Sequence, residues 1–177
     1  MTREFQNAII ARFMPHQPLI DGFEFATAGA RQQGRWPVRE LPRLRDMLAS
    51  DAGEIAYTLE GTRDERGRPG LRLGLEGTLL LRCQRCLEPL RFEVRADELL
   101  VLAATQAEID AEPLDAHAAD RVLAGKEMPV RDLIEDQLIL EVPYAPRHEA
   151  CAAGAGLQGD EKVSPFAGLR GLMRSKH

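Results

Sequence analysis

The residues best suited to chemistry are three cysteines and one histidine. Cys83 and Cys86 have the C-x-x-C spacing, which lets two thiolates face one centre, as in a zinc knuckle. His148 and Cys151 form an H-x-x-C pair farther along the chain. Together the four residues make a donor set for tetrahedral zinc, the one cofactor that the sequence indicates. The spacing leaves three interpretations open: this zinc site, free thiols in a reducing compartment, or a two-cysteine site that another molecule completes.

A redox disulfide is a further use of a C-x-x-C pair. Such a pair typically stands at the start of a helix, whereas Pro89 and an alternating apolar run follow Cys86. The sequence contains no G-x-S-x-G, no H-E-x-x-H and no glycine-rich phosphate loop. His16, His117 and His177 have no chemically partnered neighbours in the sequence. We therefore disfavour the redox interpretation and expect that the protein is not an enzyme.

The secondary structure on both sides of Cys83 and Cys86 determines where their thiols lie. Apolar residues alternate on both sides of the pair, which predicts strands over 71–82 and 90–102. These strands form a long hairpin whose turn carries the C-x-x-C pair. A third alternating segment, 54–60, completes an antiparallel β-meander that could curl into an incomplete barrel. With helices flanking it, the expected fold class is α+β.

The flanking helices are predicted from capping residues and apolar periodicity. They are expected over residues 22–33, 42–52, 129–141 and 164–173. Asp21 suits the N-cap of the first helix, and Pro129 suits the first turn of the third. The chain before Asp21 is predicted to be an extended arm or a short strand.

Composition and length indicate a soluble globular protein. The chain has 177 residues, of which 44% are hydrophobic and 29% charged. We expect a single domain, 1–177, with flexible loops at 104–127 and 147–162, where large apolar residues are sparse. No apolar stretch approaches about 20 residues, and no signal peptide opens the chain. We therefore expect a cytoplasmic protein that does not contact a membrane.

The charged residues are unevenly distributed. The net charge of -5 argues against a protein that coats nucleic acid unaided. Residues 97–141 include 12 acidic and 3 basic side chains, whereas residues 31–45 include five arginines and one glutamate. Either set could be a solvated surface. Alternatively, the arginine-rich set could form a face for phosphate and the acidic set a face for a basic protein partner. The RNA-binding candidates are Arg82, Arg85, Arg91 and Arg95. The protein-binding candidates are Asp132, Glu135 and Asp136, on the predicted polar face of the third helix.

Three segments carry a resemblance to a known family. Residues 81–89, LRCQRCLEP, resemble the C-x-R-C-L-x-P signature of the bacterial YceD family, the large ribosomal RNA subunit accumulation proteins. Residues 132–143, DLIEDQLILEVP, resemble the acidic helix of that family. Residues 164–172, SPFAGLRGL, resemble its terminal helix. Because the three motifs occur in order, the resemblance is specific and extends over most of the chain.

The resemblance implies a non-enzymatic ribosome biogenesis factor that supports accumulation of large-subunit ribosomal RNA and assembly of the large subunit. The implied partners are that RNA or a pre-ribosomal particle, and a basic zinc-ribbon ribosomal protein that is often encoded beside the family. Some members carry a later cysteine pair, whereas this chain has Cys151 with His148 before it. The residues implied by position are Cys83, Arg85, Cys86 and Cys151. The alternative function is a protein-only chaperone or adaptor for a basic ribosomal protein.

Overall fold

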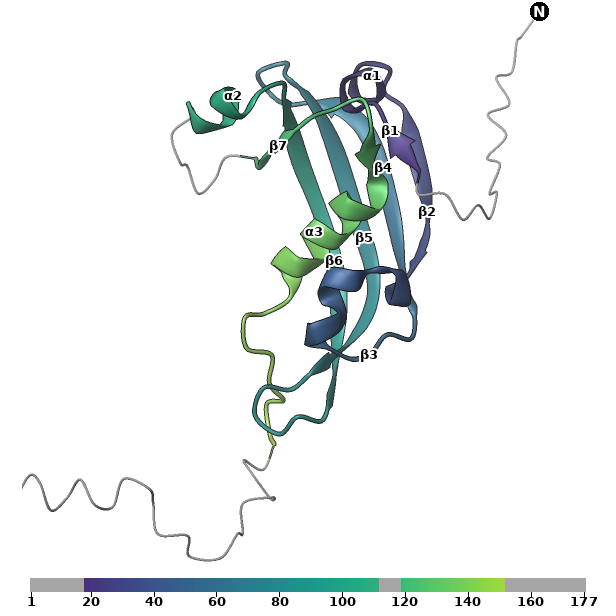
Figure 1. Ribbon diagram of the computed structural model, residues 1–177, viewed down its shortest axis with the longest axis vertical. Helices are drawn as coiled ribbons and strands as arrows, with labels where there is room; N and C mark the ends of the chain where they lie inside the picture. Colours follow the sequence, from purple (N-terminus) through teal and green to yellow (C-terminus); the bar gives the residue numbers. More distant parts are fainter. Residues whose placement is uncertain (1–17, 112–118, 152–177) are drawn as a thin grey trace, which may run out of the picture.

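The computed structural model describes residues 18–111 and 119–151 (Figure 1). The main sheet has the order β2-β4-β5-β6-β7, and β3 pairs with the last residues of β5. Its strands are β2 (Arg31–Pro37), β3 (Leu48–Ser50), β4 (Glu54–Arg63), β5 (Pro69–Arg82), β6 (Pro89–Ala103) and β7 (Arg121–Leu123). Neighbouring strands are antiparallel except β6 and β7, which are parallel. The predicted α+β fold with an antiparallel meander is confirmed, and the sheet is open.

Strands β4, β5 and β6 place alternate residues in the core. Leu73 lies opposite Leu59 of β4, and Leu81 lies opposite Leu90 of β6. The alternating leucines of β5 are all buried: Leu71, Leu73, Leu75, Leu79 and Leu81. Because successive side chains of a strand point to opposite faces, the intervening residues form a second, outer face of the sheet.

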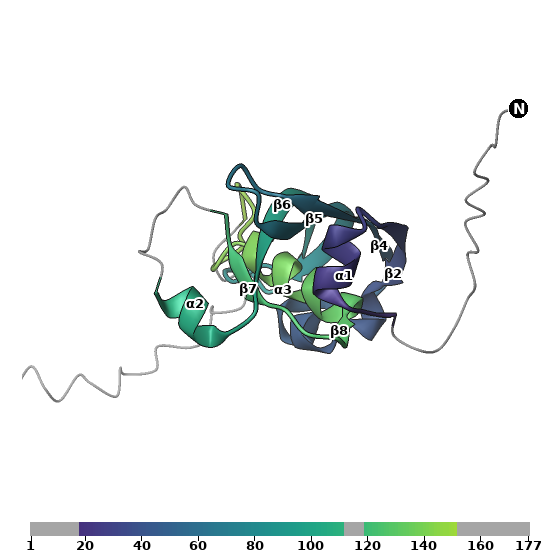
Figure 2. The same ribbon diagram turned by 90° about the horizontal axis from the view of Figure 1, so that it is seen from above.

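Three helical elements cover the inner face of the sheet: α1 (Gly22–Thr27), η2 (Pro42–Met47) and α3 (Val130–Glu141). Figure 1 and Figure 2 show α1 and α3 on the same side of the sheet. The helix predicted over 129–141 is confirmed as α3, whose Ile134 and Leu138 are fully buried. It begins at Val130, so Pro129 is not in its first turn but is the N-cap, at the end of β8. None of the helices in the described ranges is long and apolar enough to cross a membrane.

The first two predicted helices are shorter than expected. Asp21 caps α1 as predicted, because its Oδ1 accepts a hydrogen bond from the Glu24 N–H at 3.0 Å. The helix ends at Thr27, and Gly29 turns the chain with a φ of +58°. The next residues then form β2, which pairs along its whole length with β4. The second predicted helix is the 3₁₀ segment η2 followed by β3, because pairing with β5 replaces further helical turns.

The segment predicted as a loop over 104–127 contains a helix and a strand. α2 (Gln106–Asp110) begins after Thr105, whose side-chain oxygen accepts a hydrogen bond from the Glu108 N–H at 3.3 Å. Strand β7 pairs in parallel with the end of β6. Outside the sheet, β1 (Leu19–Ile20) pairs with β8 (Met128–Pro129). The predicted helix at 164–173 and most of the predicted loop at 147–162 lie outside the described residues.

Arg43 connects η2 to α3 through hydrogen bonds and ion pairs. The backbone N–H of Arg43 donates to Oε1 of Glu135 at 2.6 Å, and its Nε donates to Oε2 at 3.1 Å. The Nη1 of Arg43 also lies 2.6 Å from Oδ1 of Asp136. Glu135 is only 1% exposed, and a buried carboxylate needs such a partner. These contacts fix the helix whose C-terminal end leads to His148 and Cys151.

Candidate metal centre

The C-x-x-C pair lies in a tight turn between β5 and β6. The Leu87 N–H donates to the Cys83 carbonyl at 2.9 Å, and the Cys83 N–H donates to the Glu88 carbonyl at 3.0 Å. Leu87 has a φ of +65°, the left-handed conformation that closes this turn. The turn therefore holds both thiols at the end of the hairpin, as a zinc knuckle does.

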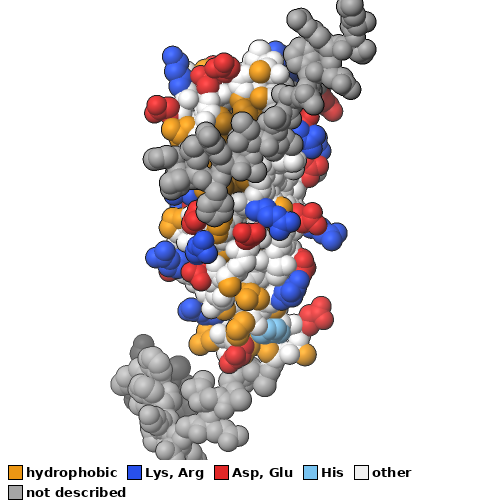
Figure 3. Space-filling view, turned by 90° about the vertical axis from the view of Figure 1, so that its right-hand side faces the viewer, with side chains coloured by type: hydrophobic (Ala, Val, Ile, Leu, Met, Phe, Trp, Pro, Cys, Tyr) orange, Lys and Arg blue, Asp and Glu red, His pale blue; other side chains and the backbone are white. Residues whose placement is uncertain are grey.

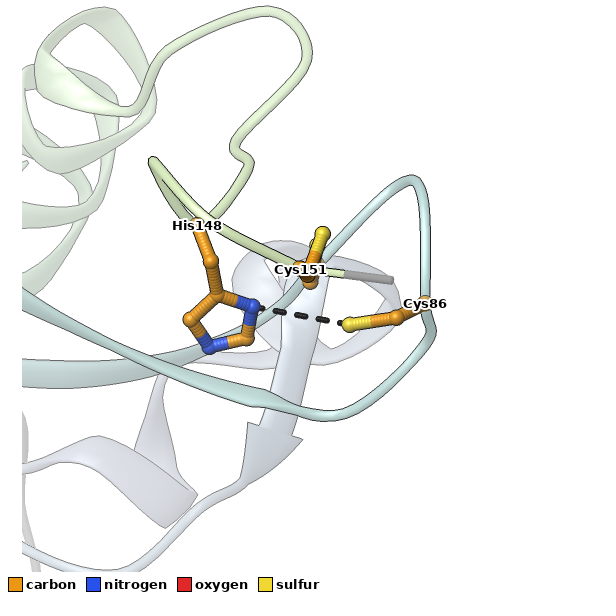
Figure 4. Close-up of side chains that lie close together, drawn as sticks. Cys86, His148 and Cys151 are labelled. Carbon is orange, nitrogen blue, oxygen red and sulfur yellow. Dashed lines mark hydrogen bonds between the residues drawn. The ribbon is translucent and has the colours of Figure 1, made fainter. Parts of the chain in front are cut away.

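The second half of the site comes from the segment after α3. Pro143 cannot continue the helix, and the chain leaves α3 in an extended conformation at Val142. The Gln84 N–H then donates to the Pro146 carbonyl at 2.8 Å, which joins this segment to the cysteine turn. His148 and Cys151 follow within five residues, and they lie beside Cys83 and Cys86. Figure 4 shows His148 and Cys151 next to Cys86.

The four donor atoms form a compact group that could hold a metal ion. They all lie within 4.8 Å of one another. Sγ of Cys83 is 3.9 Å from Sγ of Cys151, and Sγ of Cys86 is 3.5 Å from Nδ1 of His148. Tetrahedral zinc with its usual bond lengths requires about 3.8 Å between two sulfurs and about 3.5 Å between sulfur and nitrogen. The donors therefore fit zinc in type, these two pairs also fit it in spacing, and the three thiols are free of disulfides.

The histidine is oriented for ligation through Nδ1. Its Nε2 lies 3.0 Å from the carbonyl oxygen of Pro89, to which it donates when that nitrogen carries the proton. This tautomer leaves the lone pair of Nδ1 directed at the sulfur group. A backbone carbonyl that fixes the second nitrogen is the usual support of a histidine ligand. The Pro89 carbonyl was not foreseeable from the sequence, because a backbone acceptor has no signature there.

Backbone hydrogen bonds favour the thiolate at one sulfur of the group, that of Cys83. Burial disfavours the Cys83 thiolate, but hydrogen bonds from the backbone of Cys86 and Arg85 outweigh it and lower the pKa of Cys83 to about 5. The Glu88 backbone lowers the pKa of Cys86, but burial and the neighbouring sulfurs outweigh it, so that pKa is raised. Arg85 donates from Nε to Sγ of Cys151 at 2.8 Å and from Nη2 to the His148 carbonyl at 3.0 Å.

The predicted RNA-binding arginines separate into two groups. Arg82, Arg91 and Arg95 lie on the outer face of the sheet, opposite in direction to the buried Leu79 and Leu81. Arg91 contacts Glu93 at 2.7 Å yet remains largely exposed, and Arg95 lies opposite Glu76. Arg85 belongs instead to the sulfur group.

The predicted protein-binding acids do not share one exposed face. Asp132 and Asp136 are partly exposed, at 45% and 59% of the side chain, and contact Arg131 and Arg43 respectively. Glu135 is buried against Arg43, so its expected place on the polar face of the helix is corrected. Helical periodicity could not identify this, because the compensating charge comes from a residue 92 positions away.

Fold and site together define a class: an α+β protein with an open sheet, whose longest hairpin ends in a four-donor group that could hold a metal ion. The chain belongs to the YceD family, described as large ribosomal RNA subunit accumulation protein, whose sequence profile matches residues 71–173. That match covers more than half of the chain and confirms the resemblance. The family description indicates that the protein has a role in the accumulation of large-subunit ribosomal RNA. Searches of curated proteins and of solved structures found no match.

Proposed function

We propose that this protein is a non-enzymatic assembly factor for the large ribosomal subunit that acts in the cytoplasm. The observation that carries the proposal is the family match, which ties the chain to the accumulation of large-subunit ribosomal RNA. A factor that promotes assembly of the particle can raise the level of that RNA without catalysing a reaction. The proposal therefore predicts association with a precursor particle.

Zinc is the proposed cofactor, held by Cys83, Cys86, His148 and Cys151. When bound, a zinc ion with four protein ligands supplies folding energy and cross-links, and it has no open position for a substrate. The donors come from two segments that are 62 positions apart at their nearest ligands, Cys86 and His148. The chain's own residues prepare the site: Pro89 orients the histidine, and Arg85 offsets the charge of the thiolates.

The proposed RNA contact is the outer face at the cysteine end of the sheet. Arg82, Arg91 and Arg95 share this face, and Arg91 is 71% exposed. Arginine side chains there could reach phosphate oxygens with forked hydrogen bonds. Arg85 would contribute only through the N–H groups that its contacts with Cys151 and His148 leave available.

The test is a double charge reversal on this face. Arg91→Glu with Arg95→Glu should weaken binding to large-subunit precursor particles and lower the ratio of large- to small-subunit ribosomal RNA in cells that carry only this variant. Arg45→Glu is the matched control, since Arg45 is exposed on η2, away from the outer face. Unchanged particle binding in the double variant would reject the RNA-facing surface.

The alternative function is a protein-only chaperone or adaptor for a basic ribosomal protein, including the zinc-ribbon protein. The partly exposed Asp132 and Asp136 on α3 favour it, because carboxylates attract a basic partner. It predicts a complex that forms without RNA, weakens as salt is raised, and is lost on Asp132→Asn with Asp136→Asn. Retention of the complex by that double variant would remove α3 as the binding surface.

A further inference from the structure

One sulfur of the candidate metal centre lies next to a positive charge. Sγ of Cys151 accepts a hydrogen bond from Nε of Arg85 at 2.8 Å. Cys151 is also partly exposed, whereas Cys83 is buried. Cysteines that react with oxidants typically lie in electropositive, partly exposed surroundings. Cys151 therefore has the environment of a cysteine that a small oxidant can attack.

A second sulfur is close enough to react with the oxidised cysteine. Sγ of Cys83 lies 3.9 Å from Sγ of Cys151, so the two sulfurs must approach by about 1.9 Å to reach the disulfide bond length of about 2.0 Å. Redox-sensing cysteines often have such a resolving cysteine beside them. Sγ of Cys86 is also within 4.8 Å, but it contacts Nδ1 of His148 at 3.5 Å. The contact between the two sulfurs therefore favours Cys83 as the resolving residue.

The sulfur group is open to solvent. Cys86, His148 and Cys151 are all partly exposed. His148 is the one histidine within residues 18–111 and 119–151, and Figure 3 shows a histidine at the surface of the lower end of the molecule. A molecule as small as hydrogen peroxide can therefore reach the sulfur of Cys151 without unfolding of the core.

We propose that Cys151 is an oxidation site and that Cys83 resolves it, so that a hydroperoxide converts the metal centre into a Cys83–Cys151 disulfide and releases zinc. This oxidation site rests on the zinc cofactor proposed above and adds a means of regulating it. It differs from a redox C-x-x-C pair, because the new bond joins the hairpin turn to the segment after α3.

The reaction takes two electrons from the sulfurs. The Cys151 thiolate attacks one oxygen of hydrogen peroxide, the O–O bond breaks, and a sulfenic acid and a hydroxide are formed. The Cys83 thiolate then attacks the sulfur of Cys151, the S–O bond breaks, and a second hydroxide leaves. Two protons from solvent convert both hydroxides to water, so one peroxide is reduced for each disulfide formed.

The disulfide removes two of the four donors but keeps the two segments joined. Cys86 and His148 alone do not complete a structural zinc site, which requires four ligands. The new bond connects residues 68 positions apart, so the segment after α3 stays attached to the hairpin when zinc leaves. A thiol reductant breaks the bond by exchange and restores the donors, which makes the change reversible.

The test treats the full zinc-loaded chain with hydrogen peroxide at neutral pH. A chromophoric chelator measures the released zinc, a thiol reagent counts the free cysteines, and mass spectrometry of unreduced peptides locates the disulfide. Each chain should lose its zinc together with two of its three thiols, and the linked peptides should contain Cys83 and Cys151. Dithiothreitol with added zinc should restore both the thiols and the metal.

Single variants separate the two roles. Cys83→Ser keeps the oxidised cysteine and removes its resolving partner, so sulfenic acid should accumulate at Cys151, where dimedone traps it. Cys151→Ser should lose this adduct. Cys86→Ser is the matched control, because it also removes one zinc ligand but keeps the reacting pair, and it should form the same disulfide as the wild type. The mapping on the wild-type chain decides the question even if these variants unfold.

Three results would each overturn the proposal: zinc and all three thiols persist in excess peroxide, the disulfide joins Cys83 to Cys86, or dimedone labels a cysteine other than Cys151. A chain that carries no zinc before oxidation would refute the proposed cofactor, and the position of the disulfide would still confirm or overturn the oxidation site. No step uses RNA, so the result is independent of the proposed assembly role.

Discussion

The guanidinium of Arg85 donates a hydrogen bond from Nε to Sγ of Cys151 across 2.8 Å. This contact joins a residue of the cysteine turn to a donor that is 66 positions away. The contact with Cys151 is also the main cause that raises the pKa of Arg85, so the cation is stabilised beside the sulfur. An arginine that the sequence assigned to RNA therefore supports the candidate metal centre.

Replacing Arg85 should weaken metal binding. Arg85→Gln removes the positive charge beside three thiolates and should lower zinc affinity by about 10- to 100-fold, the usual effect of losing an outer-shell partner. Competition with a chromophoric chelator measures this affinity. Arg91→Gln is the control, because Arg91 contacts Glu93 and Thr78 on the outer face, away from the sulfurs. Equal zinc affinity in the two variants would contradict the role given to Arg85.

The zinc content of the purified protein should depend on the cysteine pair. Elemental analysis without chelator should give about one zinc per chain, as a tetrahedral four-ligand site requires. Cys83→Ser with Cys86→Ser should abolish zinc binding, whereas Gln84→Ala, in the same turn, should retain it. Chelation of the wild type should lower the melting temperature, because metal binding and folding are coupled. Full zinc retention by the double variant would disprove the site.

Alkaline pH should destabilise the fold through Tyr57. Burial raises the pKa of Tyr57 above its usual value of 10.0, although a hydrogen bond from Gln32 lowers it in part. The phenol therefore ionises first in the unfolded chain, so the free energy of unfolding should fall as pH rises above about 10. Tyr57→Phe should remove this component of the alkaline decline in melting temperature. Tyr144→Phe, at the fully exposed tyrosine, should leave the decline as in the wild type.

Loss of Arg43 should loosen α3. Arg43→Ala removes the guanidinium from the buried carboxylate of Glu135 and keeps the hydrogen bond from the backbone N–H of residue 43. Breaking a buried pair costs about 3–5 kcal/mol, and we expect about 1–3 kcal/mol here because Arg43 is half-exposed. Urea denaturation measures the difference. Arg91→Ala, which breaks an exposed pair, should change stability little, and a similar loss in both variants would be inconsistent with this account.

Much of the fold followed from local patterns. The alternating leucines predicted β5 because a strand buried on one face requires that period. The helix at 129–141 followed from Pro129 and a regular apolar stripe. The first helix was predicted too long because the pairing of β2 with β4 is a tertiary contact, which local propensity does not encode.

The donors of the candidate site were also identifiable, but their assembly was not. The C-x-x-C spacing has a direct geometric meaning, whereas the pairing with His148 and Cys151 depends on tertiary hydrogen bonds, from Gln84 to Pro146 and from Arg85 to His148. The same limit applies to Glu135 and Arg85, whose neighbours come from distant segments. Side chains whose environment depends on distant residues are those that the sequence alone misassigns.

The most direct test of the assembly role is sedimentation of the tagged protein from gently lysed cells, with and without ribonuclease. The account predicts that the protein migrates with large-subunit precursors and that ribonuclease releases it. A protein that sediments slowly in both samples, bound to one ribosomal protein, would contradict the RNA-dependent role and support the adaptor function.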